Sequence, residues 1–306
     1  MPKVLVATEK PFAPEAVERI REIIENAGYE FALLEKYTDA SDLHNAVEDA
    51  DALIIRSDKV DTDVMQAANK LKIVVRAGAG YDNIDLQAAS AKEVVAMNTP
   101  GQNSNAVAEL AVGMMVFMAR NQLNGTSGSE LKDKTIGIHA YGYVGKIVAR
   151  IAKGFGMVVS AFDPFLEDSI FEEDDVTRVK TVEELYSSCQ YISLHIPAND
   201  STKKSINYDL LMKMPKGATL VNTARKEVID EDSLQRILKE RSDFKYISDI
   251  APDNGPELKS EYPENCFFTP KKMGAQTSEA NINAGVSAAK QIVKFLEKGD
   301  ITFKVN

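Results

Sequence analysis

The sequence predicts an α/β protein made of two doubly wound parallel-sheet domains with a cleft between them. Three observations predict this class. Short β-rich runs alternate with helical segments, a glycine-rich turn follows one such run near residue 135, and 306 residues suffice for two domains. Because the glycine-rich turn begins so far along the chain, the residues in front of it must form a domain of their own.

The first domain is predicted from five strands and four helices. The strands are Lys3–Thr8, Phe31–Leu34, Ala52–Arg56, Ile73–Val75 and Val94–Met97, and the helices are Pro14–Ala27, Asp42–Asp49, Thr62–Ala68 and Asp85–Ala91. A final helix, Ser278–Leu296, precedes a predicted strand, Ile301–Val305, which should return to this domain because a lone strand needs a sheet to join. The predicted domains are residues 1–98 with 280–306, which bind substrate, and residues 99–279, which bind NAD.

The second domain begins with a long apolar helix, Ser104–Arg120, and a polar linker, Gln122–Glu130. A second strand–helix series then follows. Its strands are Thr135–His139, Val158–Phe162, Tyr191–His195, Ala218–Asn222 and Tyr246–Asp249, with a helix at Tyr143–Phe155 after the first of them.

Composition narrows the function. A net charge of −10 argues against nucleic acid and anionic membrane surfaces as partners. Cys189 and Cys266 are too few for a disulfide framework and indicate buried thiols in a reducing compartment. The N-terminus enters a strand at once, which predicts no signal peptide, and the apolar run Ala106–Ala119 is too short to span a bilayer. We therefore expect a cytoplasmic protein, and no residue spacing predicts a metal site.

The glycine-rich turn, HAYGYVGK, has the strand–turn–helix context of a dinucleotide-binding unit. Gly142 lets the backbone approach a pyrophosphate, Gly145 allows helix and strand to pack closely, and the amides of Tyr143 and Val144 point at the phosphates. The first glycine of the usual pattern is replaced by Ala140, so the turn must tolerate a methyl group.

An acid, Asp163, follows the next strand. Its carboxylate can accept both ribose hydroxyls and would repel a 2′-phosphate. Neither Pro164 nor Phe165 could pair with such a phosphate, so the sequence favours NAD over NADP.

Ionisable residues gather where predicted strands end. These groups are Arg56-Ser57-Asp58, Arg76-Ala77-Gly78, His195-Ile196-Pro197, Thr223-Ala224-Arg225, Asp249 and Lys271-Lys272. In an open α/β sheet, ligands bind at the carboxyl ends of the strands. Three arginines and a lysine pair at such ends of an acidic protein suit a substrate with two or three negative charges.

Five segments together resemble the D-isomer-specific 2-hydroxyacid dehydrogenase family, and most closely its short D-3-phosphoglycerate dehydrogenases with a catalytic lysine. They are RAGAGYDNID, NTPGQNSNAVAEL, the glycine-rich turn, NTARKEVIDED and TPKKMGAQT. The resemblance implies a flavodoxin-like substrate domain, a Rossmann NAD domain and NAD-dependent oxidation of a 2-hydroxy acid. In the most similar subgroup the substrate is 3-phospho-D-glycerate, the product is 3-phosphohydroxypyruvate and the reaction opens serine biosynthesis.

The resemblance also implies residue roles. Arg225 would hold the substrate carboxylate and carbonyl oxygen, and a guanidinium fork suits that task. The implied cofactor-binding positions are Ala79, Gly142, Tyr143, Val144, Gly145, Asp163, Ile196, Pro197, Thr223, Ala224, Asp249 and Gly274. The implied substrate-binding positions are Arg56, Ser57, Arg76, Ala77 and Gly78.

The chain departs from the family at the catalytic histidine. Alignment on Gly274 points to Lys272 in its place, with Lys271 second. Lys272 would take the hydroxyl proton as hydride leaves C2, so its pKa must fall from about 10.4 towards neutrality. The family's glutamate partner is also missing, because Asn254 and Asp253 occupy that region, and no acid partner is assigned.

Two other functions remain open. A hydroxypyruvate or glyoxylate reductase, or another D-2-hydroxyacid dehydrogenase, would leave Arg56 and Arg76 little to bind. A non-enzymatic NADH-sensing scaffold would not need Arg225 in a working site. The expected partner is a small anionic phosphorylated hydroxy acid, and the family implies a homodimer through the NAD domain.

Overall fold

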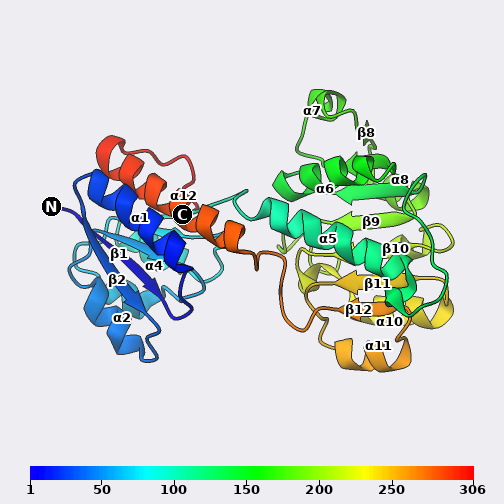
Figure 1. Cartoon of the computed structure of the whole chain (residues 1–306), viewed down its shortest axis with the longest axis horizontal. Coiled ribbons are helices and arrows are strands. Elements are labelled where there is room, and N and C mark those ends of the chain that lie inside the picture. Colours follow the sequence, from blue (N-terminus) through cyan, green and yellow to red (C-terminus); the bar gives the residue numbers. More distant parts are fainter. The chain divides into compact units, whose positions relative to one another are not determined.

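The computed structural model describes all 306 residues, and it divides them into two compact units. Unit 1 comprises Met1–Asn103 and Gln276–Asn306, and unit 2 comprises Ser104–Ala275. Each unit has its own parallel sheet with helices on its faces (Figure 1). The predicted α/β class with two parallel sheets is therefore confirmed.

Unit 1 contains a five-stranded sheet in the order β2-β1-β3-β4-β5. Its strands are β1 (Lys3–Thr8), β2 (Glu30–Glu35), β3 (Ala52–Ile55), β4 (Ile73–Arg76) and β5 (Val95–Asn98). Its helices are α1 (Pro14–Asn26), α2 (Ala40–Val47), α3 (Thr62–Ala67), α4 (Leu86–Ala91) and α12 (Ser278–Lys298). The strand order reverses between β1 and β3, so ligand-binding loops are expected at the carboxyl ends of those two strands.

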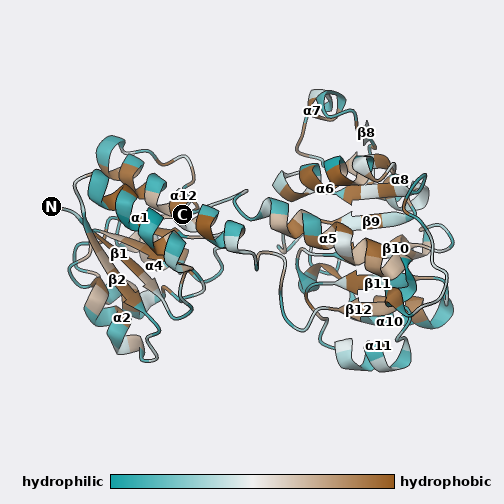
Figure 2. Ribbon diagram, in the orientation of Figure 1, coloured by the Kyte–Doolittle hydropathy of each residue, from teal (hydrophilic) through white to brown (hydrophobic).

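The pairing of α1 with α12 shows how unit 1 builds its core. Helix α1 buries Ala16, Ile20 and Ile24, which recur every four residues on one face. Gly285 of α12 allows close approach, because a Cβ there would lie 2.7 Å from Cδ1 of Ile20. Figure 2 shows the result as hydrophobic colour along the strands and alternating bands along α1 and α12.

Unit 2 contains a seven-stranded parallel sheet in the order β12-β11-β10-β9-β6-β7-β8. Its strands are β6 (Thr135–His139), β7 (Val158–Phe162), β8 (Thr177–Arg178), β9 (Tyr191–Leu194), β10 (Thr219–Asn222), β11 (Lys245–Ser248) and β12 (Cys266–Phe268). Its helices are α5 (Ser104–Ala119), α6 (Tyr143–Gly154), α7 (Asp168–Glu173), α8 (Val182–Ser188), α9 (Tyr208–Met212), α10 (Glu231–Glu240) and α11 (Gly255–Glu261), with short 3-10 turns at Asn121–Leu123 and Lys226–Val228.

Helix α5 is apolar on nearly all sides, and it packs on α6 and on the strands β10 and β11. No helix of the chain combines the length and apolar character that a membrane crossing requires. Both cysteines are buried as free thiols, as predicted.

The predicted strand Ile301–Val305 is wrong. Gly299 ends α12 in the left-handed conformation, and Asp300 then accepts a hydrogen bond from the amide of Thr302, which commits this segment to a turn. Only a single antiparallel bridge, Lys304 with Met97, joins the sheet of unit 1. The tail does return to unit 1 as expected, where the side chain of Asn306 bonds Ala96.

Candidate active site

The predicted site residues of unit 2 lie at one edge of its sheet, because every strand is parallel and each residue follows a strand end. The strand order reverses between β6 and β9, because successive strands are added on opposite sides of this pair. Open α/β sheets bind ligands at such a switch point. The turn from β6 into the first residues of α6 carries Gly142 to Gly145. The loops after β7, β9, β10, β11 and β12 carry, in order, Asp163, Ile196 with Pro197, Thr223 to Arg225, Asp249, and Lys272 with Gly274.

The two glycines of the turn have different roles. A Cβ at Gly145 would lie 2.4 Å from the carbonyl oxygen of Ala140, so close packing of α6 on β6 requires glycine there. A Cβ at Gly142 would meet nothing within 4 Å, so the space above this residue is open to a ligand. Gly142 precedes α6, whose first amides, from Tyr143 and Val144, are available to an anion.

Ala140 stands in the left-handed region, with φ of 76°. This conformation costs a residue with a Cβ about 1–2 kcal/mol. We expect Ala140→Gly to raise the free energy of unfolding by about 0.5–1 kcal/mol, since glycine's greater entropy in the unfolded chain offsets part of the relief. Urea unfolding measures this change in the free energy of unfolding. The control Ala149→Gly, within α6, should instead lose about 1 kcal/mol, and a loss at position 140 would contradict the strain.

Asp163 is buried and connects the turn to the strand β7. One carboxylate oxygen accepts from the amide of Tyr141 at 2.9 Å, and the other accepts from the amide of Phe165 at 3.0 Å. The carboxylate is thus held in one orientation at the end of β7, beside the open space over Gly142.

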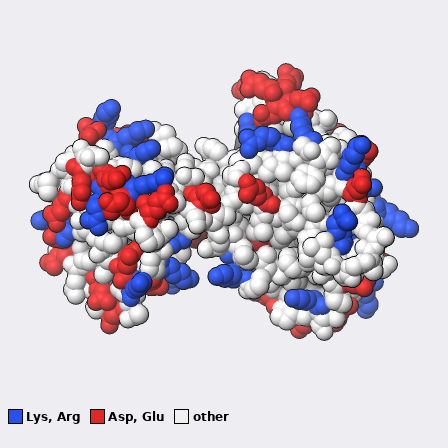
Figure 3. All heavy atoms as spheres, viewed as in Figure 1, with Lys and Arg blue, Asp and Glu red and all other residues white.

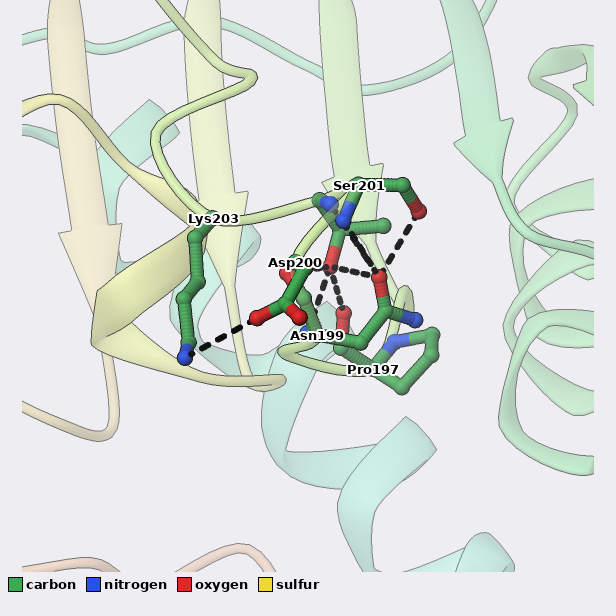
Figure 4. A network of polar contacts seen from close by, with 6 residues as sticks. Pro197, Asn199, Asp200, Ser201 and Lys203 are labelled. Atoms are coloured by element: carbon green, nitrogen blue, oxygen red, sulfur yellow. Dashed lines mark hydrogen bonds and ion pairs between the residues drawn. The ribbon is translucent and has the colours of Figure 1, made fainter.

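The loop after β9 is held by its own side chains (Figure 4). Asn199 Oδ1 accepts from the amides of Ser201 and Thr202, and the hydroxyl of Thr202 donates to the carbonyl of Pro197. The Nζ of Lys203 lies 3.6 Å from Oδ1 of Asp200. Ile196 is buried and Pro197 is exposed, so the loop presents Pro197 at the sheet edge.

Asn222 belongs to this site, although it is not among the residues predicted from the sequence. Its side chain accepts from the amide of Ala224 at 3.0 Å and donates to the carbonyl of Arg225 at 2.9 Å. It therefore sets the course of the loop that carries Arg225. An asparagine at a strand end, two residues before a turn, is the local signal that could have identified it.

Asp249 directly follows β11 and is fully buried. Its Oδ2 accepts from the amide of Gly274 at 2.8 Å, while its Oδ1 has no hydrogen-bond partner. Burial raises the pKa of Asp249, and the Gly274 amide with the charges of Lys272 and Arg225 only partly opposes it. The charges of Lys272 and Arg225 thus act on one buried carboxylate whose Oδ1 still lacks a donor.

Gly274 is required beside Asp249, because a Cβ there would lie 2.8 Å from Oδ2. Thr223 also has a buried polar atom, its Oγ1, without a hydrogen-bond partner. Two polar atoms awaiting a partner at the edge of the sheet suit an amide and hydroxyl-bearing ligand.

Asp249→Asn should weaken NAD binding by about 10- to 100-fold, because the amide can offer only one acceptor oxygen. Either Gly274 or the ligand amide then loses its acceptor. Isothermal titration with NAD measures the change. The control Asp253→Asn alters an exposed carboxylate of the next loop and should leave the affinity within twofold. Equal losses in both variants would contradict the role of Asp249.

Asp253 lies beside the position where the family's glutamate is expected. It is exposed and forms an ion pair with Lys226. Its amide and that of Asn254 donate to Glu231, which holds the loop after β11. Asn254 has a buried Oδ1 without a partner.

Two histidines are packed beneath the loops of unit 2. His139 lies 3.2 Å from the hydroxyl of Tyr186, and His195 lies 3.0 Å from the hydroxyl of Ser193. Burial lowers the pKa of His139 to about 4, against an opposing effect of Asp163. Burial, with His139 beside it, lowers the pKa of His195 to about 3.

These histidines should make the protein acid-sensitive. Between the two folded pKa values and about 6.5, the unfolded chain binds more protons, so stability falls as pH falls. We expect each histidine to remove about 1.5 kcal/mol of unfolding free energy between pH 6.5 and 5. Urea unfolding across this range measures the slope, which His195→Asn should reduce. The partly exposed His44→Asn should leave it unchanged, and the same slope in all three proteins would contradict the assignment.

In unit 1, Arg56 follows β3 and is already engaged. Its Nη1 donates to the carbonyls of Lys10 and Pro11, and its Nη2 donates to Asn281 at 2.6 Å. Three of its five N–H groups are therefore used within unit 1, so at most two remain for a ligand. Its neighbour Ser57 is exposed.

Arg76 ends β4 and curls over the following turn. Its Nε donates to the carbonyl of Arg56 at 3.0 Å. Gly78 has φ of 151°, and a Cβ there would overlap Nη1 of Arg76 at 1.4 Å. Glycine at 78 therefore permits the observed position of this arginine, with Ala77 buried beneath and Ala79 exposed beyond.

Comparisons with known proteins place the chain in a class. The family model for the D-isomer specific 2-hydroxyacid dehydrogenase NAD binding domain matches residues 103–271. The chain belongs to the D-isomer specific 2-hydroxyacid dehydrogenase family, and unit 2 carries its NAD-binding domain. The predicted family and the predicted cofactor, NAD, are confirmed. The open space over Gly142 and the unpartnered Asp249 Oδ1 fit this cofactor.

Particular relatives differ in their named activities. D-3-phosphoglycerate dehydrogenase of Methanocaldococcus jannaschii is 36% identical over 279 residues, 86% of this chain and 53% of that protein. The chain thus spans about half the length of this relative. Hydroxypyruvate reductase of Thermotoga maritima is 33% identical over 285 residues, 87% of this chain and 92% of that protein. The crystal structure of NAD+-bound 3-phosphoglycerate dehydrogenase of Entamoeba histolytica matches with a TM-score of 0.90 and 50% identity, covering 100% of this chain and 98% of that one.

Proposed function

We propose that this protein is an NAD-dependent dehydrogenase that oxidises 3-phospho-D-glycerate to 3-phosphohydroxypyruvate, the first step of serine biosynthesis. One observation carries the chemistry: buried Asp249 has an Oδ1 without a donor, at the same sheet edge whose loops carry Lys272 and Arg225. The 3-phosphoglycerate dehydrogenases of E. histolytica and M. jannaschii support the choice of substrate.

Each residue has a distinct task in this proposal. NAD, when bound, supplies the hydride acceptor for the C2 hydrogen. Asp249 Oδ1 would accept a hydrogen bond from the nicotinamide carboxamide and so would help to hold the cofactor. Arg225 grips the substrate carboxylate and the oxygen at C2 with its fork of donors. Lys272, as a neutral amine, takes the hydroxyl proton, and as an ammonium it returns that proton in the reverse reaction.

The unit 1 residues Arg56, Ser57, Arg76, Ala77 and Gly78 are proposed to bind the phosphate end of the substrate. Arginine suits this task because its planar donors match phosphate oxygens. A second candidate, reduction of hydroxypyruvate, is favoured by two observations. Three of the five N–H groups of Arg56 already donate hydrogen bonds within unit 1, which leaves fewer for a phosphate. The alignment with the T. maritima reductase also covers 92% of that protein.

An absorbance assay for NADH distinguishes these functions. We expect NADH formation from 3-phospho-D-glycerate with kcat/KM at least tenfold above that for D-glycerate and D-lactate. Faster NADH consumption with hydroxypyruvate than with 3-phosphohydroxypyruvate would favour the reductase. NADH binding without turnover of any of these substrates would favour a sensing scaffold and overturn the proposal.

We also propose that the protein forms a homodimer through unit 2. Unit 2 exposes apolar side chains of Leu123, Phe155 and Val158, with exposed fractions of 69%, 45% and 55%. A partner subunit that covered these side chains would remove apolar surface from water, which favours association. Sedimentation velocity should show a dimer at micromolar concentration, and a monomer there would overturn this part of the proposal.

A further inference from the structure

The edge strand β8 places an arginine beside the acid of the cofactor site. Strands β7 and β8 pair in parallel, with Ala161 opposite Arg178, two residues before Asp163. As a result, Nη2 of Arg178 lies 3.5 Å from the carbonyl oxygen of Asp163. Pro164 and Phe165, which follow Asp163 directly along the chain, cannot pair with a 2′-phosphate, whereas Arg178 reaches this strand end from the neighbouring strand.

Arg178 is held in this position by α7. Its guanidinium lies 5.1 Å from the ring centroid of Phe171, and its Nη1 pairs with the carboxylate of Asp168. Its side chain is only 20% exposed, although β8 is an edge strand. A long cation restrained by a ring and a carboxylate loses less freedom when it binds an anion.

A second cation shares the same carboxylate. Lys180 Nζ lies 2.7 Å from Asp168, so one negative charge serves two positive ones. The cluster of Arg178, Lys180 and Asp168 thus has a net charge of +1 beside the strand end. Acidic residues gather over α7 and basic residues lie next to them on the surface in Figure 3.

The Asp163 carboxylate is buried at the strand end that Arg178 reaches. It accepts from the amides of Tyr141 and Phe165, which are donors that a phosphate could equally use. Removing this carboxylate would free two backbone donors at the strand end that Arg178 reaches.

We propose that Arg178, supported by Lys180, forms a latent binding site for a 2′-phosphate, and that the carboxylate of Asp163 alone closes this site. Arg178 and Asp163 together then determine which adenine dinucleotide the protein binds. This inference rests on the proposed NAD site of unit 2 and adds a specificity-determining residue outside the glycine-rich turn and the strand that follows it.

The experiment measures binding of two probes that lack nicotinamide, 5′-ADP and 2′,5′-ADP, by isothermal titration. The wild type should bind 5′-ADP at least tenfold more tightly than 2′,5′-ADP. Asp163→Ser should raise the affinity for 2′,5′-ADP at least tenfold. Adding Arg178→Gln to that variant should abolish the gain while leaving 5′-ADP binding within threefold.

A matched control is available in Arg236. This arginine also lies over an aromatic ring, that of Tyr208, and also pairs with a carboxylate, that of Glu240. The double variant Asp163→Ser/Arg236→Gln should keep the full gain, which separates a local contact from a change of net charge. Asp163→Asn preserves the shape of the side chain and so tests for disturbance of the turn by serine. This variant should also bind 2′,5′-ADP more tightly than the wild type does.

Three results would overturn the inference. The first is a gain that survives Arg178→Gln, and the second is no gain in either Asp163 variant while 5′-ADP still binds. In both cases the NAD site itself stands, and Arg178 only secures α7. The third is a wild type that binds neither 5′-ADP nor NAD, which would overturn the proposed function as well.

Discussion

Lys272→Met is expected to lower kcat by about 10²- to 10⁴-fold while NAD affinity stays within threefold. Methionine keeps the length of the side chain but can neither accept nor donate the proton of the C2 hydroxyl. Lys272 is exposed in the loop after β12, so its loss should leave the fold unchanged. Steady-state NADH formation from 3-phospho-D-glycerate measures the effect, and equilibrium binding of NAD checks that the site is intact.

Lys271→Met is the matched control for this prediction. The two lysines are adjacent and both exposed, so the same substitution removes the same charge one residue away. We expect Lys271→Met to retain at least half of the wild-type kcat. The opposite ranking would move the proton transfer to Lys271, and near-normal turnover in both variants would contradict a catalytic lysine altogether.

Arg225→Lys is expected to lower kcat/KM by about 10²- to 10³-fold, chiefly through a higher KM for the hydroxy acid. Lysine keeps the positive charge but cannot hold a carboxylate and the neighbouring oxygen with two parallel N–H groups. The loss of charge-assisted hydrogen bonds worth about 1.5–3 kcal/mol each accounts for this size. Asn222 should still hold the loop in this variant, because its side chain bonds only backbone atoms of residues 224 and 225.

The control for this variant is Arg236→Lys, on the exposed face of α10, for which kcat/KM should remain within twofold. NAD affinity should change little in Arg225→Lys. If KM for the hydroxy acid stays at its wild-type value while NAD binding weakens, Arg225 belongs to the cofactor site and the proposed clamp is wrong.

Much of the fold could be predicted from the sequence, because its elements have strong local signals. Buried runs such as Leu53–Ile55 and Val74–Val75 are typical of parallel strands, and the structure places them in β3 and β4. The two-residue strand β8 could not be predicted this way, since so short a segment has no periodicity. The tail at Ile301–Val305 has strand-forming residues, but the cap at Gly299 and the turn at Asp300 override that preference.

The unit 2 site was predictable to the level of residue type. Strand-end positions and the family motifs indicated Asp163, Arg225, Asp249 and Lys272. Their individual roles in catalysis and binding stay predictions. The brace at Asn222 was not predicted, because its function depends on where two backbone atoms of a folded loop lie.

By itself, the sequence determined the α/β class, the family, NAD as the cofactor and the late position of the glycine-rich turn, because these depend on local patterns and residue types. Only the tertiary structure decided which groups meet. It placed the amide of Gly274 on Asp249, left Asp249 Oδ1 without a donor, paired Asp253 with Lys226, and brought Arg178 to Asp163 across an edge strand. Burial and hydrogen bonding between residues far apart in the chain depend on the packed fold, and no local pattern encodes them.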